Sequence, residues 1–209
     1  GEKDVNGAGS GSPVSGRLAT VSGKSDAQGR IAVTLTSTHI ASYRVTATVN
    51  GTQETSGAIS FTADAATAAI SSLSADKTVD LIAGTDSVTL SASVQDANGL
   101  PVSDAVVSWA GDNAKGVFSE TRSSTDSNGS TSVTYSSTLA IPTVITVKMG
   151  TVSQKTVNLT FIPDLQTAAI STVINDKRSA VASGTDLISM LATVKDRYGN
   201  PVSQANVSW

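Results

Sequence analysis

The sequence predicts an all-β protein made of tandem sandwich domains, because it combines an internal repeat, a strand-forming composition and regularly spaced turn motifs. The chain of 209 residues matches itself at an offset of 100: among the 43 pairs from 67/167 to 109/209, 21 are identical and no gap is needed. A period of this length belongs to a whole domain, since solenoid repeats are shorter. We therefore expect domains of about 100 residues, a size at which each can bury its own core.

The composition narrows the class of protein. Thr and Val, whose β-branched side chains favour strands, are abundant, whereas aromatic residues are 4% and charged residues 15% of the chain. The net charge is −3 and the basic residues are scattered, which gives no footprint for nucleic acid or anionic lipid. No apolar run is long enough to cross a membrane. Cysteine is absent, so we expect packing rather than disulfides to hold each domain, as suits a chain exported through an oxidising compartment.

One complete copy spans residues 67–166, and its first half predicts three strands. The opening strand is interrupted near Asp76 and Lys77, and it carries the apolar residues Ile70, Leu73, Val79 and Leu81. The next strand follows period two, with the apolar positions Val88, Leu90, Ala92 and Val94. A turn from Asp96 to Gly99, followed by Pro101, then leads to a third strand. The inward face of that strand is Ala105, Val107 and Trp109.

The second half of the copy predicts four more strands. A short strand at 116–118 precedes a second turn from Asp126 to Gly129. The remaining strands are marked by three apolar sets: Val133 and Tyr135, then Val144, Ile145, Val147 and Met149 after Pro142, then Val157, Leu159 and Phe161. No stretch shows the helical i, i+3, i+4, i+7 pattern. Seven or more short strands in about 100 residues, with a Trp on the third, predict an immunoglobulin-like β-sandwich.

The copies divide the chain unevenly. Residues 1–66 match the C-terminal half of a repeat, 67–166 form the complete repeat, and 167–209 match an N-terminal half. The segment Gly1–Gly16 matches nothing and is interpreted as a flexible lead-in or an insertion. A half-sandwich exposes an apolar face and unpaired edges. We therefore expect the terminal halves of different molecules to complement one another head to tail.

Two motifs recur in the copies. The first joins an Asp-x-x-Gly turn to Pro-Val and a Trp: Asp96, Gly99, Pro101, Val102, Val107 and Trp109, and again Asp196, Gly199, Asn200, Pro201, Val202, Val207 and Trp209. The second is Thr125, Asp126, Gly129, Val133, Tyr135, Ser137 and Thr138, with Asp26, Gly29, Val33, Leu35, Ser37 and Thr38 in the first copy. Together they resemble the group 1 bacterial immunoglobulin-like domains of the intimin/invasin (inverse autotransporter) adhesins. Leu100 stands where that family usually has Asn, and we expect no effect on the fold.

The resemblance implies an extended rod of tandem domains on the bacterial cell surface. In that family, a β-barrel anchors the chain in the outer membrane, the tandem domains project outward, and a tip domain often does the binding. The implied partners are therefore neighbouring domains of the same chain and, through the parent protein, a host surface receptor. The resemblance implies neither a cofactor nor nucleic-acid binding nor membrane insertion by this part.

Catalytic residues are lacking in the sequence. His39 is the single histidine and is expected in a surface loop or at a strand end. There is no cysteine nucleophile and no G-x-S-x-G elbow, so we expect no enzyme. The Asp-x-x-Gly turns could contribute to a calcium site, but each brings one carboxylate where calcium prefers six to eight oxygens, so turn capping is the favoured interpretation. The repeated Asp-Lys pair could form an isopeptide, although a solvated strand break is favoured.

The candidate site residues are therefore structural. They are the turn residues Asp26, Gly29, Asp96, Gly99, Asp126, Gly129, Asp196 and Gly199, the prolines Pro101 and Pro201, and the aromatic residues Trp109, Phe118, Phe161 and Trp209. Alternation places both Trp residues in a core rather than on a sugar-stacking surface. The alternative to a stalk is a module that binds host protein or glycan through loops or edge strands, for which Tyr43 and Tyr198 are the candidate exposed aromatic residues.

Overall fold

The computed structural model describes residues 3–5 and 16–209. The chain forms two compact units, one of Gly1–Thr67 with Gln95–Leu100 and the other of Ala68–Val94 with Pro101–Trp209. Within the described residues no helix is long and apolar enough to cross a membrane. The helical structure described consists of two 3-10 turns, η1 (Ala65–Thr67) and η2 (Leu165–Thr167).

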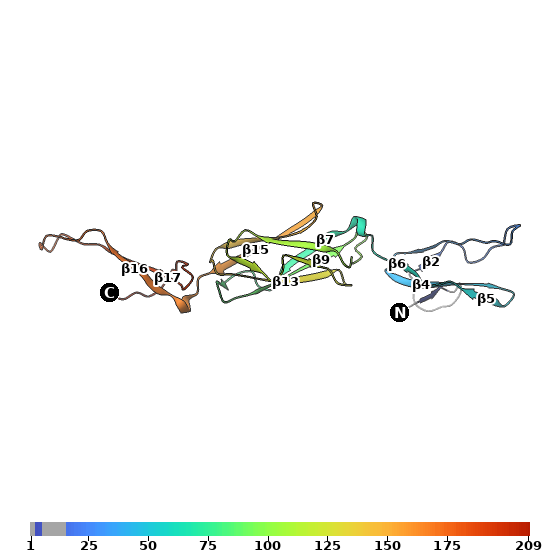
Figure 1. The fold of residues 1–209 in the computed structure, drawn as a ribbon, viewed down its shortest axis with the longest axis horizontal. Helices are drawn as coiled ribbons and strands as arrows, with labels where there is room; N and C mark the ends of the chain where they lie inside the picture. The colour runs from blue at the N-terminus through green and yellow to red at the C-terminus, as the bar shows by residue number, and fades with distance from the viewer. Residues whose placement is uncertain (1–2, 6–15) are drawn as a thin grey trace. The chain divides into compact units, whose positions relative to one another are not determined.

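The complete repeat is a sandwich of two sheets, drawn from teal to orange in Figure 1. One sheet has five strands in the order β12 (Arg122–Ser124), β10 (Val106–Gly111), β14 (Pro142–Met149), β15 (Ser153–Ile162) and β8 (Leu81–Ile82). The other has four, in the order β11 (Gly116–Phe118), β13 (Ser130–Ser137), β9 (Val88–Gln95) and β7 (Ala69–Ala75). The pair β15–β8 is parallel. This arrangement confirms the predicted all-β, immunoglobulin-like class.

The core lies between the two sheets, and period two explains which residues fill it. Along β9, the apolar positions from Val88 to Val94 are buried and the residues between them face outward. Trp109 on β10 is 4% exposed. Phe161, on β15 of the same sheet, and Tyr135, on β13 of the facing sheet, are also buried. Aromatic rings also meet in this core, since the Tyr135 ring lies 4.6 Å from Phe118 and 6.0 Å from Phe161, between ring centroids.

The structure corrects the predicted elements at two places. The opening strand ends at Ala75 and Val79 is exposed, because Val79 lies in the break before β8 and not on either strand. The strand β12 was not predicted, since its residues Arg, Ser and Ser carry no apolar pattern. It forms because its backbone pairs with β10 at the sheet edge.

The N-terminal unit reproduces half of the sandwich. The strand β2 (Gly16–Leu18) pairs with β3 (Leu35–Ser37) in the register that β11 and β13 show 100 residues later. Strand β4 (Ala41–Val49) pairs with β5 (Thr52–Thr55) and β6 (Ile59–Phe61), and β1 (Lys3–Val5) pairs with it in parallel. In the segment predicted as a lead-in, residues 1–2 and 6–15 lie outside the described residues, whereas Lys3–Val5 and Gly16 belong to strands.

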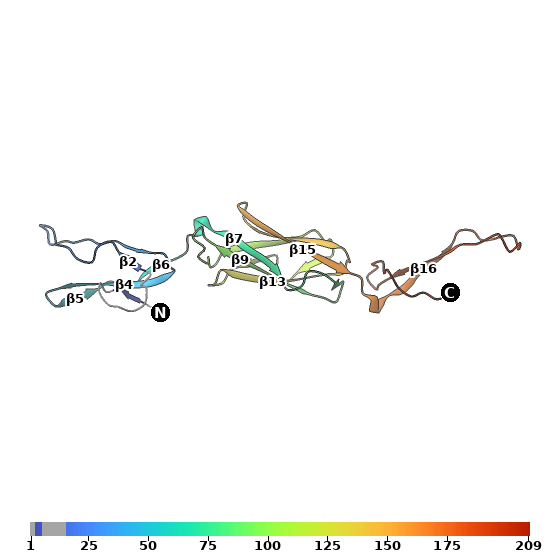
Figure 2. The ribbon, with the colours of Figure 1, turned by 180° about the vertical axis from the view of Figure 1, so that it is seen from behind.

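The C-terminal part of the second unit is a two-stranded sheet. It consists of β16 (Ala169–Asn175) and β17 (Met190–Lys195), shown at the red end of the colour scale in Figure 2. Trp209, predicted to lie in a core, is 77% exposed here. Trp109 is covered because its strand β10 pairs with β12 and β14. Among the described residues, no strand pairs with the segment that carries Trp209, so its ring stays exposed.

Candidate functional site

The junction between the complete repeat and the C-terminal repeat is the part of the second unit where side chains from different repeats meet. The chain leaves β15 and turns through η2, whose N-cap Asp164 accepts a 3.0 Å bond from the Gln166 amide. The Asp164 amide in turn donates to Oδ2 of Asp196, at 3.2 Å. Since Asp196 begins the Asp-x-x-Gly turn of the following repeat, one carboxylate ties the connecting segment to that turn.

Asn200, at the end of the same turn, reaches back to the complete repeat. Its Nδ2 donates to the carbonyl of Thr138 at 2.9 Å and to Oδ2 of Asp196 at 2.8 Å. Its Oδ1 accepts from the amide of Ala140 at 2.9 Å. The side chain is 2% exposed, so these bonds satisfy an amide that is removed from water.

Tyr198 makes a second contact across this junction. Its hydroxyl donates to the carbonyl of Gly84 at 3.3 Å, and Arg197 lies over its ring at 4.7 Å from the centroid. A Cβ built on Gly84 would lie 1.9 Å from the Tyr198 ring, so a glycine is required there, and its φ of +76° also favours glycine. Tyr198 is therefore not the free exposed aromatic residue that the sequence suggested, although 41% of its surface remains open.

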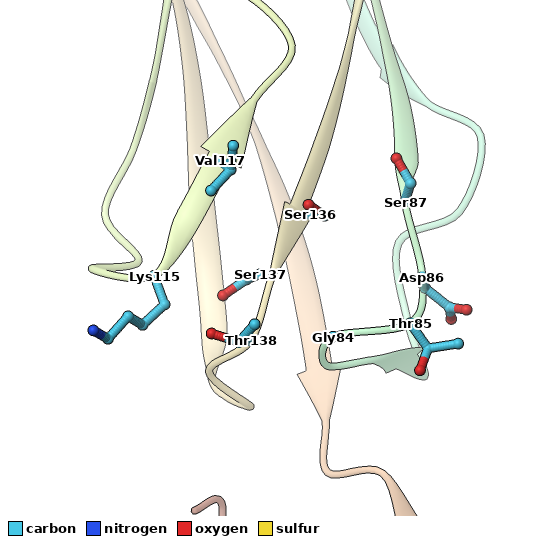
Figure 3. Close-up of a pocket in the computed structure, with 9 residues that line it drawn as sticks. All are labelled: Gly84, Thr85, Asp86, Ser87, Lys115, Val117, Ser136, Ser137 and Thr138. Carbon is cyan, nitrogen blue, oxygen red and sulfur yellow. The ribbon is translucent and has the colours of Figure 1, made fainter. Parts of the chain in front are cut away.

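The end of the complete repeat carries a shallow hollow of about 260 Å³, shown in Figure 3. Its lining is mixed: Val117 is one lining residue, and hydroxyls of Ser136, Ser137 and Thr138 lie between Lys115 on one side and Asp86 on the other. Gly84 and Thr138, which accept bonds from Tyr198 and Asn200, also line it. The lining holds no aromatic ring and no pair of convergent acids, so it offers no platform for sugar stacking or acid–base chemistry.

The Asp-x-x-Gly turns are capped by their own carboxylates. In each turn, Oδ1 of the Asp accepts from two backbone amides at 2.8–2.9 Å, and the glycine has φ between +71° and +88°. A carboxylate used in this way stabilises a tight turn without any ion. Among the described residues, no three acidic or histidine side chains are grouped to hold a metal.

Three of these turns carry a further contact. Gly129 lies against the backbone of β9 and Pro101, since a Cβ there would lie 2.6 Å from the Val94 carbonyl. Asp96 accepts a 3.0 Å bond at Oδ2 from the Asp64 amide, as Asp196 does from Asp164. This bond lowers the pKa of Asp96 more than any other contact does.

The pKa of Asp196 is also lowered, and two opposing effects act on it. Burial acts to raise it, but hydrogen bonds from the Asn200 side chain and from the Asn200, Asp164 and Tyr198 amides outweigh burial and lower it. The junction carboxylate is therefore held in its ionised form by the groups that meet there.

The predicted core residues Trp109 and Tyr135 are buried in the complete repeat. Trp109 donates from Nε1 to Ser123 at 2.9 Å, which satisfies its one polar atom inside the core. Burial, more than the nearby Asp112 charge, raises the pKa of Tyr135 to about 12, and its hydroxyl has no hydrogen-bond partner among the described residues.

Tyr43 is fully buried with its hydroxyl 2.9 Å from the Ser37 hydroxyl, which corrects the expectation of an exposed ring. His39 is exposed between β3 and β4, beside Thr38, as expected.

The lysine at the strand break forms an ion pair in both copies, each time with the Asp nine residues further along the chain. Lys77 contacts Asp86 at 3.0 Å, and Lys177 contacts Asp186 in the same way. The Ile82 amide, followed by Lys77, lowers the pKa of Asp86. These contacts are exposed ion pairs that brace the loops before β9 and β17, which agrees with a solvated strand break.

Comparison with known proteins identifies the repeat. Residues 70–162 match the family model of the bacterial Ig-like domain (group 1). The inverse autotransporter adhesin YeeJ of Escherichia coli K12 is 29% identical over 181 residues, which are 84% of this chain and 8% of YeeJ. The chain thus spans 8% of the length of this relative.

Two solved structures share the fold. Invasin, described as a bacterial integrin-binding protein, has a TM-score of 0.51 and 23% identity, covering 87% of this chain and 37% of its own. The Escherichia coli adhesin FdeC has a TM-score of 0.52 and 19% identity, covering 92% of this chain and 65% of its own. The complete repeat is therefore a group 1 bacterial immunoglobulin-like domain. The motifs predicted this domain family. In sequence the chain is similar to the adhesin YeeJ, and in fold it is similar to invasin and FdeC.

Proposed function

We propose that this chain is a stalk segment of a bacterial outer-membrane adhesin, which carries a distal binding domain away from the cell surface. The observation that carries the proposal is the junction at Asp164, Asp196 and Asn200, where a short connection is fixed by buried hydrogen bonds. A catalyst needs convergent reactive groups, and a ligand-binding module needs an exposed recognition surface. The Asp164, Asp196 and Asn200 junction places buried polar contacts between repeats, which is what a spacer requires.

The mechanism is geometric. Each sandwich adds about 35–45 Å, from strands of about 8–10 residues at about 3.3 Å each together with the end loops. Short junctions limit swing, so successive repeats form a semi-rigid rod. In this proposal the chain itself lies outside the cell, at the bacterial surface. Anchoring in the outer membrane and contact with a host receptor are assigned to other parts of the parent protein.

The terminal halves extend the proposal. We divide the chain into an N-terminal half-repeat (1–66), the complete repeat (67–166) and a C-terminal half-repeat (167–209). A second copy of this chain complements each terminal half head to tail.

Adhesion of coated beads tests the proposal. Beads that carry this chain are compared, on host cells and matrix proteins, with beads that carry an unrelated β-sandwich domain at the same density. A stalk predicts equal, low adhesion for the two. Adhesion above the sandwich control would assign binding to these domains themselves, and the alternative of a host-binding module would replace the stalk.

A further inference from the structure

The two junctions of the chain use the same turn but carry different residues at the positions that meet the preceding repeat. The turn of the complete repeat reads Asp-Ala-Asn-Gly-Leu-Pro from Asp96, and that of the C-terminal repeat reads Asp-Arg-Tyr-Gly-Asn-Pro from Asp196. The Asp, Gly and Pro that shape the turn are common to both. The residues that differ are Ala97, Asn98 and Leu100 against Arg197, Tyr198 and Asn200.

The differing residues are the ones that act across the second junction. Asn200 donates to Thr138 and accepts from Ala140, while Tyr198 donates to Gly84. The side chain of Leu100 has neither a donor nor an acceptor, so it cannot replace Asn200. If the Asn200 amide stayed buried without these partners, its desolvation would not be compensated by hydrogen bonds. The contact is therefore favourable only in the arrangement of the two repeats that brings the amide to Thr138 and Ala140.

The receiving loop is alike only in part in the two copies. The loop after β13 is held by Ser137, whose Oγ accepts from the Leu139 amide at 3.0 Å. The loop after β3 is held by Ser37, whose Oγ accepts from the His39 amide at 3.1 Å. A Thr follows each serine, whereas Ile40 stands where the second junction has Ala140. The two junctions therefore differ in the turn that inserts and in the side chains of the loop that receives it.

We propose that Asn200, supported by Tyr198, is a lock that fixes the second junction, whereas the first junction, with Leu100 and Asn98 in these places, turns more freely. This rests on the proposed stalk function and deepens it, because it assigns stiffness junction by junction from two positions of one turn. In a rod built from both kinds of junction, the junctions that lack the Asn act as hinges. The partner that the hollow end of a repeat fits is therefore the Tyr-Gly-Asn turn of the next repeat.

Distances between spin labels, measured by pulsed electron paramagnetic resonance, test the lock. The chain lacks cysteine, so labels enter only at introduced sites. Exposed Ser132 and Thr172 span the second junction, and exposed Gln53 and Ser132 span the first. The wild-type chain is expected to give a narrow distance distribution across the second junction and a broad one across the first.

Substitutions then separate the lock from simple unfolding. Asn200→Leu and the nearly isosteric Asn200→Asp are expected to broaden the second distribution until its width approaches that of the first. Asn158→Leu, on the exposed face of β15, is the matched control and should change nothing. Near-ultraviolet circular dichroism of Trp109 reports in each case that the complete repeat is folded.

The outcomes are distinct. Unchanged widths in both Asn200 variants, with the complete repeat folded, would overturn the lock. That result would leave the stalk proposal in place, since the bead assay judges the stalk by adhesion and not by stiffness. Equal widths at the two wild-type junctions would also overturn the lock.

Discussion

At the scale of single residues, Trp109 and Trp209 show what a local pattern determines. Both follow Val-Ser in the same motif, and alternation predicts a core position for both. Trp109 is 4% exposed because β12 and β14 flank its strand, whereas Trp209 lies on no strand and is 77% exposed. The pattern therefore predicts Trp109 correctly and Trp209 wrongly, because burial depends on neighbouring strands that no local pattern specifies.

This pair gives a matched stability test. Trp109→Ala is expected to lower the free energy of unfolding of the complete repeat by about 3–5 kcal/mol, as for other large core truncations. Trp209→Ala should lower it by less than about 1 kcal/mol, since an exposed ring contributes little. Urea denaturation followed by far-ultraviolet circular dichroism measures both. Equal losses in the two variants would contradict the burial that separates them.

The junction carboxylates make stability depend on pH in a defined direction. The pKa values of Asp96 and Asp196 are lower in the folded chain than their ordinary value of about 3.9. Each therefore contributes stability that is complete above that ordinary value and is lost as the pH falls through the folded pKa. The melting temperature should fall on acidification below about pH 4, and Asp96→Asn or Asp196→Asn should make this fall shallower. Variants that keep the wild-type slope would show that other groups titrate.

At the scale of elements, the strands that the sequence predicts are the long alternating ones. Strand β9 matches its prediction because half of its residues face a core and half face solvent. Strand β12 and the parallel strand β1 depend on backbone pairing at sheet edges, which leaves no apolar pattern to detect. The junction contacts escape prediction for a related reason, because Asn200 and Ala140 are brought together by the fold across 60 positions.

The terminal strands lead to a prediction about pairing between molecules. Ile31 and Val33 in the first unit, and Ile188 and Met190 in the second, are exposed apolar residues. In the complete repeat, Leu90 pairs with Val133. Shifted by the repeat, this register places Met190 of one molecule opposite Val33 of another.

Disulfide trapping measures this register. A Val33→Cys chain mixed with a Met190→Cys chain is expected to form a cross-linked heterodimer, and the mass from light scattering should rise with concentration. Val33→Cys mixed with Leu191→Cys is the control one residue out of register, where strand alternation turns the side chain to the other face. A monomeric mass at every concentration, with no heterodimer above the control, would contradict head-to-tail completion.

At the scale of the whole molecule, the repeat and its motifs predict the family, while the individual character of each junction lies in the residues between the motif positions. Leu100 was noted as a departure from the usual Asn and was expected to be neutral. The fold agrees, since the turn at Asp96 keeps its hydrogen bonds and its glycine conformation. The consequence of the departure concerns the neighbouring repeat, which a single turn does not reveal.

The groups that receive Asn200 and Tyr198 are main-chain atoms: the carbonyls of Thr138 and Gly84 and the amide of Ala140. Every repeat possesses such atoms, but the approach to them is open only where a small residue such as Gly84 stands. The downstream repeat therefore supplies the side chains of the junction, and the upstream repeat supplies the glycine. Recombination that duplicates, deletes or exchanges whole repeats would transfer a stiff junction wherever the upstream repeat keeps that glycine, so a lineage could change the number of its repeats without having to evolve each contact again.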